Sequence, residues 1–156
     1  MRSVATLIIS LALAYGIALI GSLFTIGAID TWYVTLVKPA LNPPNWIFGP
    51  VWTILYTCMA VAAWRVYLRR HSGRGAKSAL LLYGAHLLVN MLWSIAFFGL
   101  HMPLLALGII GILLVSILII SIRFKRIDMV AGALFIPYII WVSFALYLNL
   151  MIVLLN

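Results

Sequence analysis

The segment Trp32–Tyr56 has the sequence WYVTLVKPALNPPNWIFGPVWTILY and is the one long connection in a very apolar chain. It contains four of the six prolines and three of the six tryptophans. Proline restricts the backbone, so a proline-rich connection can pack over a cavity at low entropic cost. The segment therefore predicts a stiff aromatic loop, called the lid loop (27–46), that leads into an apolar helix.

The composition around this segment is that of a membrane protein. The chain has 156 residues, of which 67% are hydrophobic and 8% are charged, whereas soluble domains have about 25% charged residues. The length favours a single domain, 1–156. The net charge of +8 could suggest nucleic acid, but the basic residues form short clusters between apolar runs. That pattern indicates membrane topology and disfavours a nucleic-acid partner.

Five apolar segments are long enough to cross a bilayer, which needs about 20 residues. The sequence thus predicts an all-α fold, an integral membrane bundle of five transmembrane helices. The first segment is too long for a signal peptide, and we interpret it as a retained helix. Pro137 lies inside the fifth segment and should kink it or lean on a neighbouring helix. The expected spans are 4–26, 47–64, 78–100, 103–122 and 129–155.

Basic residues in the short loops predict the orientation. Eight of them follow the second and fourth spans, whereas only Lys38 lies in the other loops. Short basic loops face the cytoplasm. The N-terminus is then expected inside, and the C-terminus and lid loop on the outer side of a bacterial inner membrane. Gly73 and Gly75 mark the turn after the second span. The eight residues are Arg65, Arg69, Arg70, Arg74, Lys77, Arg123, Lys125 and Arg126.

Conventional hydrolytic or phosphoryl-transfer chemistry has little support in the sequence. The two acids, Asp30 and Asp128, lie at opposite ends of the predicted bundle, so they cannot act as an acid–base pair. Cys58 has no partner for a metal site, and His86 alone forms no catalytic triad. We therefore expect no metal and no obligatory cofactor.

Polar and aromatic residues share one face of the third span. Tyr83, His86, Asn90, Trp93 and Phe97 are separated by three or four residues, which is the spacing of one helix face. Polar side chains at mid-membrane must face the interior. Two interpretations remain open at this point: hydrogen bonds between helices, or the polar part of a ligand cavity.

Similar residues occur on three other spans. The fifth has Tyr138, Trp141, Ala145 and Asn149 on one face, the second has Trp52 and Tyr56, and the first has Tyr15 and Ser22. Sparse polar groups among aromatic rings favour a cavity for a flat, largely apolar molecule. Ordinary aromatic packing is the alternative.

The motifs resemble the translocator protein family, which includes the bacterial tryptophan-rich sensory proteins and the peripheral benzodiazepine receptor. The resemblance rests on matches along most of the chain. These are Trp32-Tyr33, Lys38-Pro39, Asn42-Pro43-Pro44, Gly49–Tyr56, Asn90–Trp93, Phe97-Phe98-Gly99, Leu134–Trp141 and Leu148-Asn149.

The resemblance implies a five-helix membrane bundle, commonly a homodimer. It also implies a pocket under the first long loop for protoporphyrin IX, haem and synthetic benzodiazepine-type ligands, with links to sterol or lipid binding and light-dependent porphyrin breakdown. Carried over by residue, the ligand site comprises Tyr33, Pro43, Pro44, Trp52, Tyr56, Asn90, Trp93, Phe97, Trp141 and Ala145.

Two departures limit the resemblance. Leu41 stands where many members have a tryptophan, which weakens the case for porphyrin photochemistry. No basic residue follows Tyr147, so the sterol consensus of some members is not carried over.

The resulting hypothesis is a membrane protein that binds tetrapyrroles and membrane lipid. It would act in tetrapyrrole sensing, regulation or transport, with porphyrin photo-degradation or lipid and sterol transport as alternatives. Arg65 and its neighbours are expected to set topology rather than to bind the carboxylates of a ligand, because they lie on the opposite side from the lid loop.

Overall fold

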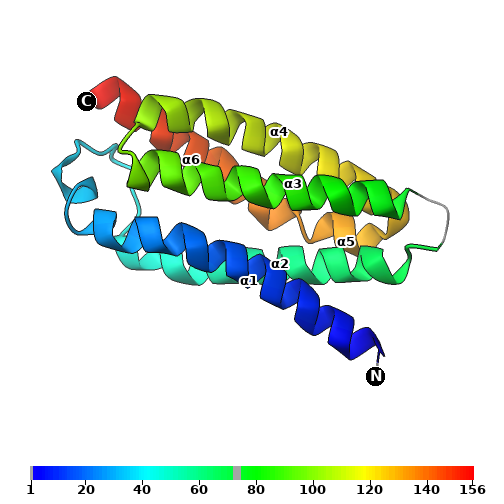
Figure 1. The fold of residues 1–156 in the computed structure, drawn as a ribbon. Coiled ribbons are helices and arrows are strands. Elements are labelled where there is room, and N and C mark those ends of the chain that lie inside the picture. Colours follow the sequence, from blue (N-terminus) through cyan, green and yellow to red (C-terminus); the bar gives the residue numbers. More distant parts are fainter. Residues whose placement is uncertain (1, 72–74) are drawn as a thin grey trace.

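The computed structural model describes residues 2–71 and 75–156, which form helices and connecting loops without any β-strand. Gly73 and Arg74, which the sequence places in the turn after the second span, lie outside this description, as does the Arg2 side chain. Figure 1 shows the long helices side by side, with the lid loop near the C-terminus. The helices are α1 (Arg2–Ile29), η1 (Tyr33–Thr35), η2 (Asn45–Ile47), α2 (Phe48–Leu68), α3 (Ala76–Ser94), η3 (Ile95–Gly99), α4 (Pro103–Ile127), α5 (Met129–Ala133) and α6 (Ile136–Leu155).

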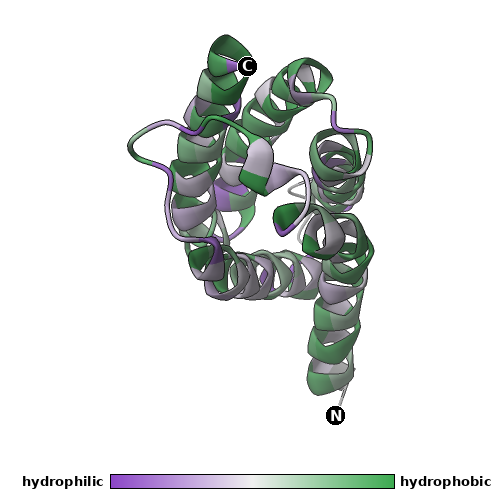
Figure 2. Cartoon of the chain, turned by 90° about the vertical axis from the view of Figure 1, so that its left-hand side faces the viewer, coloured by the Kyte–Doolittle hydropathy of each residue, from purple (hydrophilic) through white to green (hydrophobic). Residues whose placement is uncertain are grey.

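Five helical segments in the described chain are long and apolar enough to cross a membrane, which confirms the predicted all-α fold. Helices are required there because lipid offers no hydrogen-bond partners to the backbone. In Figure 2, which looks onto the lid loop, the helices are mostly in hydrophobic colours. The segments are Ser3–Ile29, Asn45–Leu68, Ala76–Gly99, Pro103–Ile127 and Met129–Leu155.

The fifth segment is broken in front of Pro137, as its sequence predicts. α5 ends at Ala133, and α6 begins at Ile136, with Pro137 in its first turn. Proline has no N–H to continue the helical ladder and is tolerated at a helix start. The break lets α5 turn back toward α4, where a Cβ on Gly132 would lie 2.7 Å from the Lys125 Cα.

Two helices extend past their expected C-terminal ends far enough to take basic residues from loops onto helix ends. α2 continues to Leu68 rather than Trp64, and α4 continues to Ile127 rather than Ile122. Arg65 therefore lies in the last turn of α2. Cations are favourable near a helix C-terminus, and their long stems reach the interface from within a span.

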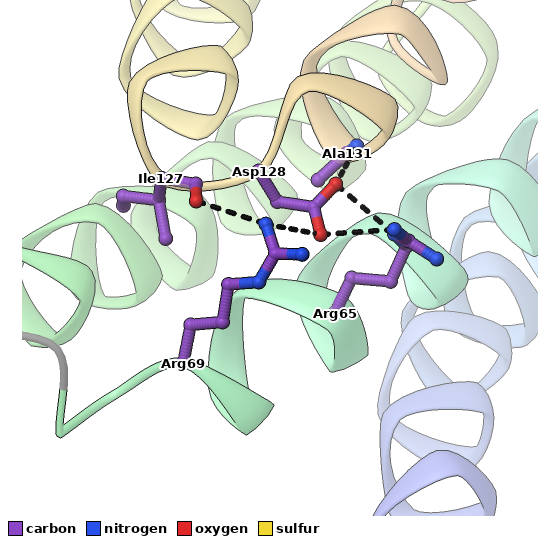
Figure 3. A network of polar contacts seen from close by, with 5 residues as sticks. All are labelled: Arg65, Arg69, Ile127, Asp128 and Ala131. Atoms are coloured by element: carbon purple, nitrogen blue, oxygen red, sulfur yellow. Dashed lines mark hydrogen bonds and ion pairs between the residues drawn. The ribbon is translucent and has the colours of Figure 1, made fainter.

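Asp128 joins these basic residues in an ion-pair network (Figure 3). Its carboxylate lies 3.0 Å from the Arg65 Nη2 atom and 2.7 Å from the Arg69 Nη1 atom. It also accepts a 2.9 Å bond from the Ala131 N–H, which caps α5. Arg65 and Arg69 therefore pair with a carboxylate of the chain itself, an interaction that was not predicted from the sequence. Arg65 and Asp128 are 63 residues apart in the sequence, so local sequence patterns do not predict this contact.

The environment of Asp128 has opposing effects on its pKa. Burial alone raises the pKa of this carboxyl, but the hydrogen bonds from Arg65 and Ala131 and the two nearby cations outweigh it. The pKa is therefore held below its ordinary value. The network fixes the end of α2 to the α4–α5 turn.

Candidate ligand-binding site

A cavity of about 560 Å³, called here the lid-side cavity, lies between α1, α2 and α3 and reaches the lid loop. Drug-sized ligands commonly occupy pockets of about 300–1,000 Å³. Its walls are mostly apolar. They comprise Tyr15, Ala18, Leu19, Gly21, Ser22, Thr25, Ile26, Ile29, Tyr33, Asn45, Phe48, Gly49, Trp52, Thr53, Tyr56, Asn90, Trp93, Ser94 and Phe98.

The structure brings together half of the residues predicted for the site. Tyr33, Trp52, Tyr56, Asn90 and Trp93 all line the lid-side cavity. The aromatic residues of α2 and the stripe on α3 therefore do face a shared space.

The other five predicted residues lie outside the cavity wall. Pro43 is half-buried and Pro44 is exposed in the lid loop. Trp141 packs its ring edge on Phe48, with centroids 5.9 Å apart, and so lies behind a lining residue. Ala145 is buried on α6. α6 packs chiefly against α4, whereas α1 packs against α2 and α3, so α6 lies on the other side of the bundle.

Phe97 is replaced in the wall by its neighbour Phe98. The end of α3 widens into the π-helical turn η3, in which the Leu100 N–H donates to the Ile95 carbonyl five residues earlier. A wider turn shifts the facing residue by one position. Phe98 therefore lines the cavity, while Phe97 is buried behind it and stacks on Trp93 at 5.7 Å. A regular 3.6-residue period could not predict this shift.

The contribution of α1 is larger than its aromatic content suggests. Tyr15 and Ser22 were indicated by the sequence, and both line the cavity. Half of the remaining α1 wall is small: Ala18, Gly21 and Thr25 share a face with Ser22. Small residues leave space rather than fill it. Their spacing of three and four residues in the sequence predicts a shared helix face, but it does not indicate that this face borders a ligand cavity.

Aromatic rings form the inner wall of the cavity. The rings of Trp52 and Trp93 are neighbours, with centroids 6.4 Å apart and planes tilted by 30°. Trp52 also contacts Tyr56 at 5.7 Å and meets Tyr138 edge-on. The Trp93 indole donates to Asn149 Oδ1 at 3.2 Å, which fixes the ring plane. Such a wall favours a flat, unsaturated ligand.

Asn90 is held at both ends of its amide. Its Oδ1 accepts from the Tyr56 hydroxyl at 2.7 Å, and its Nδ2 donates to the Tyr138 hydroxyl. The sequence left open whether the polar residues of the third span bond to other helices or line a cavity. Asn90 does both. Among the described residues, three cavity side chains have polar atoms without a hydrogen-bond partner: Asn45, Trp52 and Ser94.

The lid loop is docked on the helices. Tyr33 is buried and its hydroxyl donates to Asn42 Oδ1 at 2.7 Å, which ties the two halves of the loop together. Burial raises the pKa of the Tyr33 hydroxyl, although the bond to Asn42 opposes this. Trp32 stacks on His101 of the α3–α4 connection, with centroids 4.4 Å apart.

The middle of the lid loop is hydrogen-bonded to the residue that follows α6. The Asn156 side chain accepts from the Val37 N–H at 3.0 Å and donates to the Val37 carbonyl at 3.1 Å. Leu41 and Trp46 are 65% and 73% exposed, and neither lines the cavity. The position where many family members have a tryptophan is therefore on the outside of the loop.

Known proteins resemble the chain over most of its length. It is 37% identical to the tryptophan-rich protein TspO of Chlorobaculum tepidum, with 99% of this chain and 98% of that protein covered. It is 39% identical to the tryptophan-rich sensory protein of Cereibacter sphaeroides, covering 85% and 84%. The human translocator protein is 31% identical, covering 83% and 78%.

The sequence profile of the TspO/MBR family matches residues 8–155, which include the lid loop, four of the five apolar helices of the described chain and most of the first. Together with the aromatic cavity beneath that loop, this match shows that the chain is an integral membrane protein and a member of the TspO/MBR family.

Proposed function

We propose that this protein binds tetrapyrroles, such as protoporphyrin IX and haem, and similar flat hydrophobic molecules in the lid-side cavity. The observation that carries the proposal is that the neighbouring indoles of Trp52 and Trp93 line one apolar cavity of about 560 Å³. Aromatic faces stack on a conjugated macrocycle, and the unpaired Trp52 indole can donate to a polar edge. The role would be tetrapyrrole sensing, regulation or transport.

The basic residues support an orientation for this function. Seven described basic residues lie near the ends of α2 and α4 and at the start of α3, whereas Lys38 is in the lid loop. The seven are Arg65, Arg69, Arg70, Lys77, Arg123, Lys125 and Arg126. Under the positive-inside rule the N-terminus is cytoplasmic, and the lid loop and C-terminus lie on the outer side of a bacterial inner membrane. The ligand would then enter from the outer side. Homodimer formation is proposed on the family resemblance alone.

A second candidate function is light-dependent porphyrin degradation. It is favoured by Trp52, whose indole lies in the cavity wall without a hydrogen-bond partner among the described residues. A tryptophan in contact with an excited porphyrin is positioned for electron transfer. Lipid or sterol transport is the remaining alternative, and it would use the same apolar cavity.

The test is a titration of purified protein with protoporphyrin IX, followed through tryptophan quenching and porphyrin absorbance. We expect saturable quenching in the wild type and its loss in Ala18→Phe, because Ala18 lines the cavity and a phenyl group would fill it. Ala12→Phe is the matched control, since Ala12 is exposed on the same helix and lines neither this cavity nor the second one described below.

The outcomes separate the three functions. Non-saturable quenching, or equal binding by Ala18→Phe and the wild type, contradicts tetrapyrrole binding in this cavity. After illumination, an unchanged porphyrin spectrum excludes the photochemical enzyme, whereas loss of the main absorbance band supports it. Uptake of porphyrin or sterol into sealed proteoliposomes tests transport.

A further inference from the structure

A second cavity, called here the basic-side cavity, lies at the opposite end of the same three helices. Its volume is about 450 Å³, and it shares no lining residue with the lid-side cavity. Figure 1 shows the N-terminal half of α1 diverging from the bundle at this end. The cavity is lined by Thr6, Ile9, Ser10, Leu13, Ile17, Ala63, Trp64, Tyr67, Leu80, Tyr83, Gly84 and Leu87.

The polar groups in this lining are mostly bonded to the protein itself. The Ser10 hydroxyl donates to the Ala60 carbonyl at 2.7 Å, and the Thr6 hydroxyl donates to the Ser3 carbonyl at 2.9 Å. The Trp64 indole donates to the same Ser3 carbonyl at 2.9 Å. The hydroxyl of Tyr83, which is buried, has no hydrogen-bond partner among the described residues. The rest of the wall is mostly hydrocarbon and has no pair of tryptophans like that of the lid-side cavity. Such a wall suits a flexible aliphatic chain better than a macrocycle.

A cation lies beside this cavity. The Arg70 guanidinium carbon is 4.1 Å from the ring centroid of Tyr67, which lines the cavity. Trp64 and Tyr67, both near the end of α2, are the residue types that gather at membrane interfaces.

Arg70 has no carboxylate partner in the described chain. The sequence contains two acids. Asp128 is paired with Arg65 and Arg69, and Asp30 follows the end of α1 next to the lid loop, at the other end of the bundle. Within the described residues, Arg70 makes a 3.1 Å bond to the Tyr67 carbonyl and the contact with the Tyr67 ring. Its charge is therefore available to an anion at the membrane surface.

We propose that the basic-side cavity binds an anionic phospholipid, with one acyl chain between α1, α2 and α3 and the phosphate beside Arg70. An apolar cavity next to an uncompensated cation matches both parts of such a lipid. The bilayer supplies this molecule at high concentration, and basic groups near a membrane surface attract anionic headgroups. The site is separate from the proposed tetrapyrrole site.

The experiment is native mass spectrometry of detergent-purified protein after addition of phosphatidylglycerol or phosphatidylcholine with identical acyl chains. We expect the wild type to retain phosphatidylglycerol about fivefold more than phosphatidylcholine, the preference that one interfacial cation supplies. Arg70→Gln should reduce the retention of phosphatidylglycerol to that of phosphatidylcholine. This variant changes a half-buried residue beyond the end of α2 and leaves the helices intact.

A second variant tests the chain-binding part. Gly84 lines the cavity, and an added Cβ would meet nothing within 4 Å, so Gly84→Leu should fill space without a clash and reduce retention of both lipids. Gly108→Leu is the matched control, because Gly108 also has open space around it and lines neither cavity. Its retention should equal that of the wild type.

The proposal is overturned if the wild type shows no preference between the two lipids, or if Gly84→Leu retains phosphatidylglycerol as well as the wild type does. Retention of oleate but not of phosphatidylglycerol also overturns it, since the occupant would then be a free fatty acid. Porphyrin titration of each variant is an independent readout, because loss of lipid binding should leave the lid-side cavity unaffected.

Discussion

The two ends of the bundle are built from the same three helices but offer different chemistry. At the lid end, α2 and α3 present aromatic rings to a cavity that a docked loop reaches. At the basic end, the cavity wall is largely aliphatic, and an ion-pair network holds the nearby helix ends. At the lid end a loop packs its side chains on the helices, whereas at the basic end an ion-pair network joins α2 to the α4–α5 turn. From this difference we expect the junction of α2, α4 and α5 to be more rigid than the lid end.

The largest expected effect tests this rigidity through two glycines. A Cβ on Gly132 would lie 2.7 and 2.8 Å from backbone atoms of Lys125, which cannot move independently. A Cβ on Gly99, at the lid end, would lie 2.7 Å from a ring atom of Phe24, which can rotate away. We expect Gly132→Ala to lower the free energy of unfolding by about 3 kcal/mol and Gly99→Ala by about 1 kcal/mol.

Thermal or denaturant unfolding of the two variants in the same detergent measures this contrast. Gly16→Ala is the control, since nothing lies within 4 Å of its added Cβ and alanine favours the helix by about 1 kcal/mol. An equal loss at Gly99 and Gly132 would show that the two ends do not differ in rigidity.

The second prediction concerns the ion pairs of Asp128 with Arg65 and Arg69 at the basic end. Asp128→Asn leaves Arg65 and Arg69 without their carboxylate, and we expect a loss of about 2 kcal/mol because both cations are partly solvated. Asp30→Asn at the lid end should change stability little, since Asp30 is exposed.

The pH dependence gives the same network a separate test. The Asp128 pKa is lowered in the folded protein, so its contribution is present above its ordinary unfolded pKa. It is lost as the pH falls through the lower folded value. The wild type should therefore lose stability in mild to strong acid more steeply than Asp128→Asn. Parallel acid-unfolding curves for the two proteins would contradict this role.

The third prediction concerns the aromatic wall of the lid-side cavity. Trp52→Phe should weaken protoporphyrin IX binding by about threefold to tenfold, because it removes stacking area and the free indole donor. Trp141→Phe should have a smaller effect, since Trp141 acts only through Phe48. Trp46→Phe is the control, because Trp46 is 73% exposed. A larger effect at Trp141 than at Trp52 would place the ligand nearer to α6.

The smallest expected effect is at the docked lid loop. Asn156→Ala removes both hydrogen bonds to the exposed Val37 backbone, which we expect to cost about 0.5–1 kcal/mol. Faster ligand dissociation, measured by competition in stopped flow, is the expected consequence. Unchanged dissociation would show that Trp32 and Tyr33 hold the loop without help from α6.

Much of the fold follows from local sequence features. Long apolar runs predict the five helices, and Pro137 predicts the break in the fifth. The placement of Trp52, Tyr56 and Asn90 in one cavity wall also follows, because helical periodicity fixes which side chains share a face.

The parts that could not be predicted depend on contacts between distant segments. Which helices meet cannot be read from the faces alone, so the sequence does not show that α1 supplies one wall of the lid-side cavity while Trp141 and Ala145 of α6 lie outside its lining. The pairing of Arg65 with Asp128 likewise depends on where α2 ends in space. The small residues of α1 could not be predicted as part of the cavity wall from their side-chain chemistry. A small side chain borders a cavity only if the neighbouring helices leave space beside it, and the sequence does not show where those helices lie.

The π-helical turn at Ile95–Gly99 has a consequence for how relatives of this protein can vary. Deleting one codon within this stretch would restore the ordinary ladder and leave the reading frame intact. A different aromatic ring would then face the cavity, while the residues of α3 before this turn would keep their positions. We therefore expect that insertion or deletion of a single residue here could change the ligand preference without any substitution elsewhere.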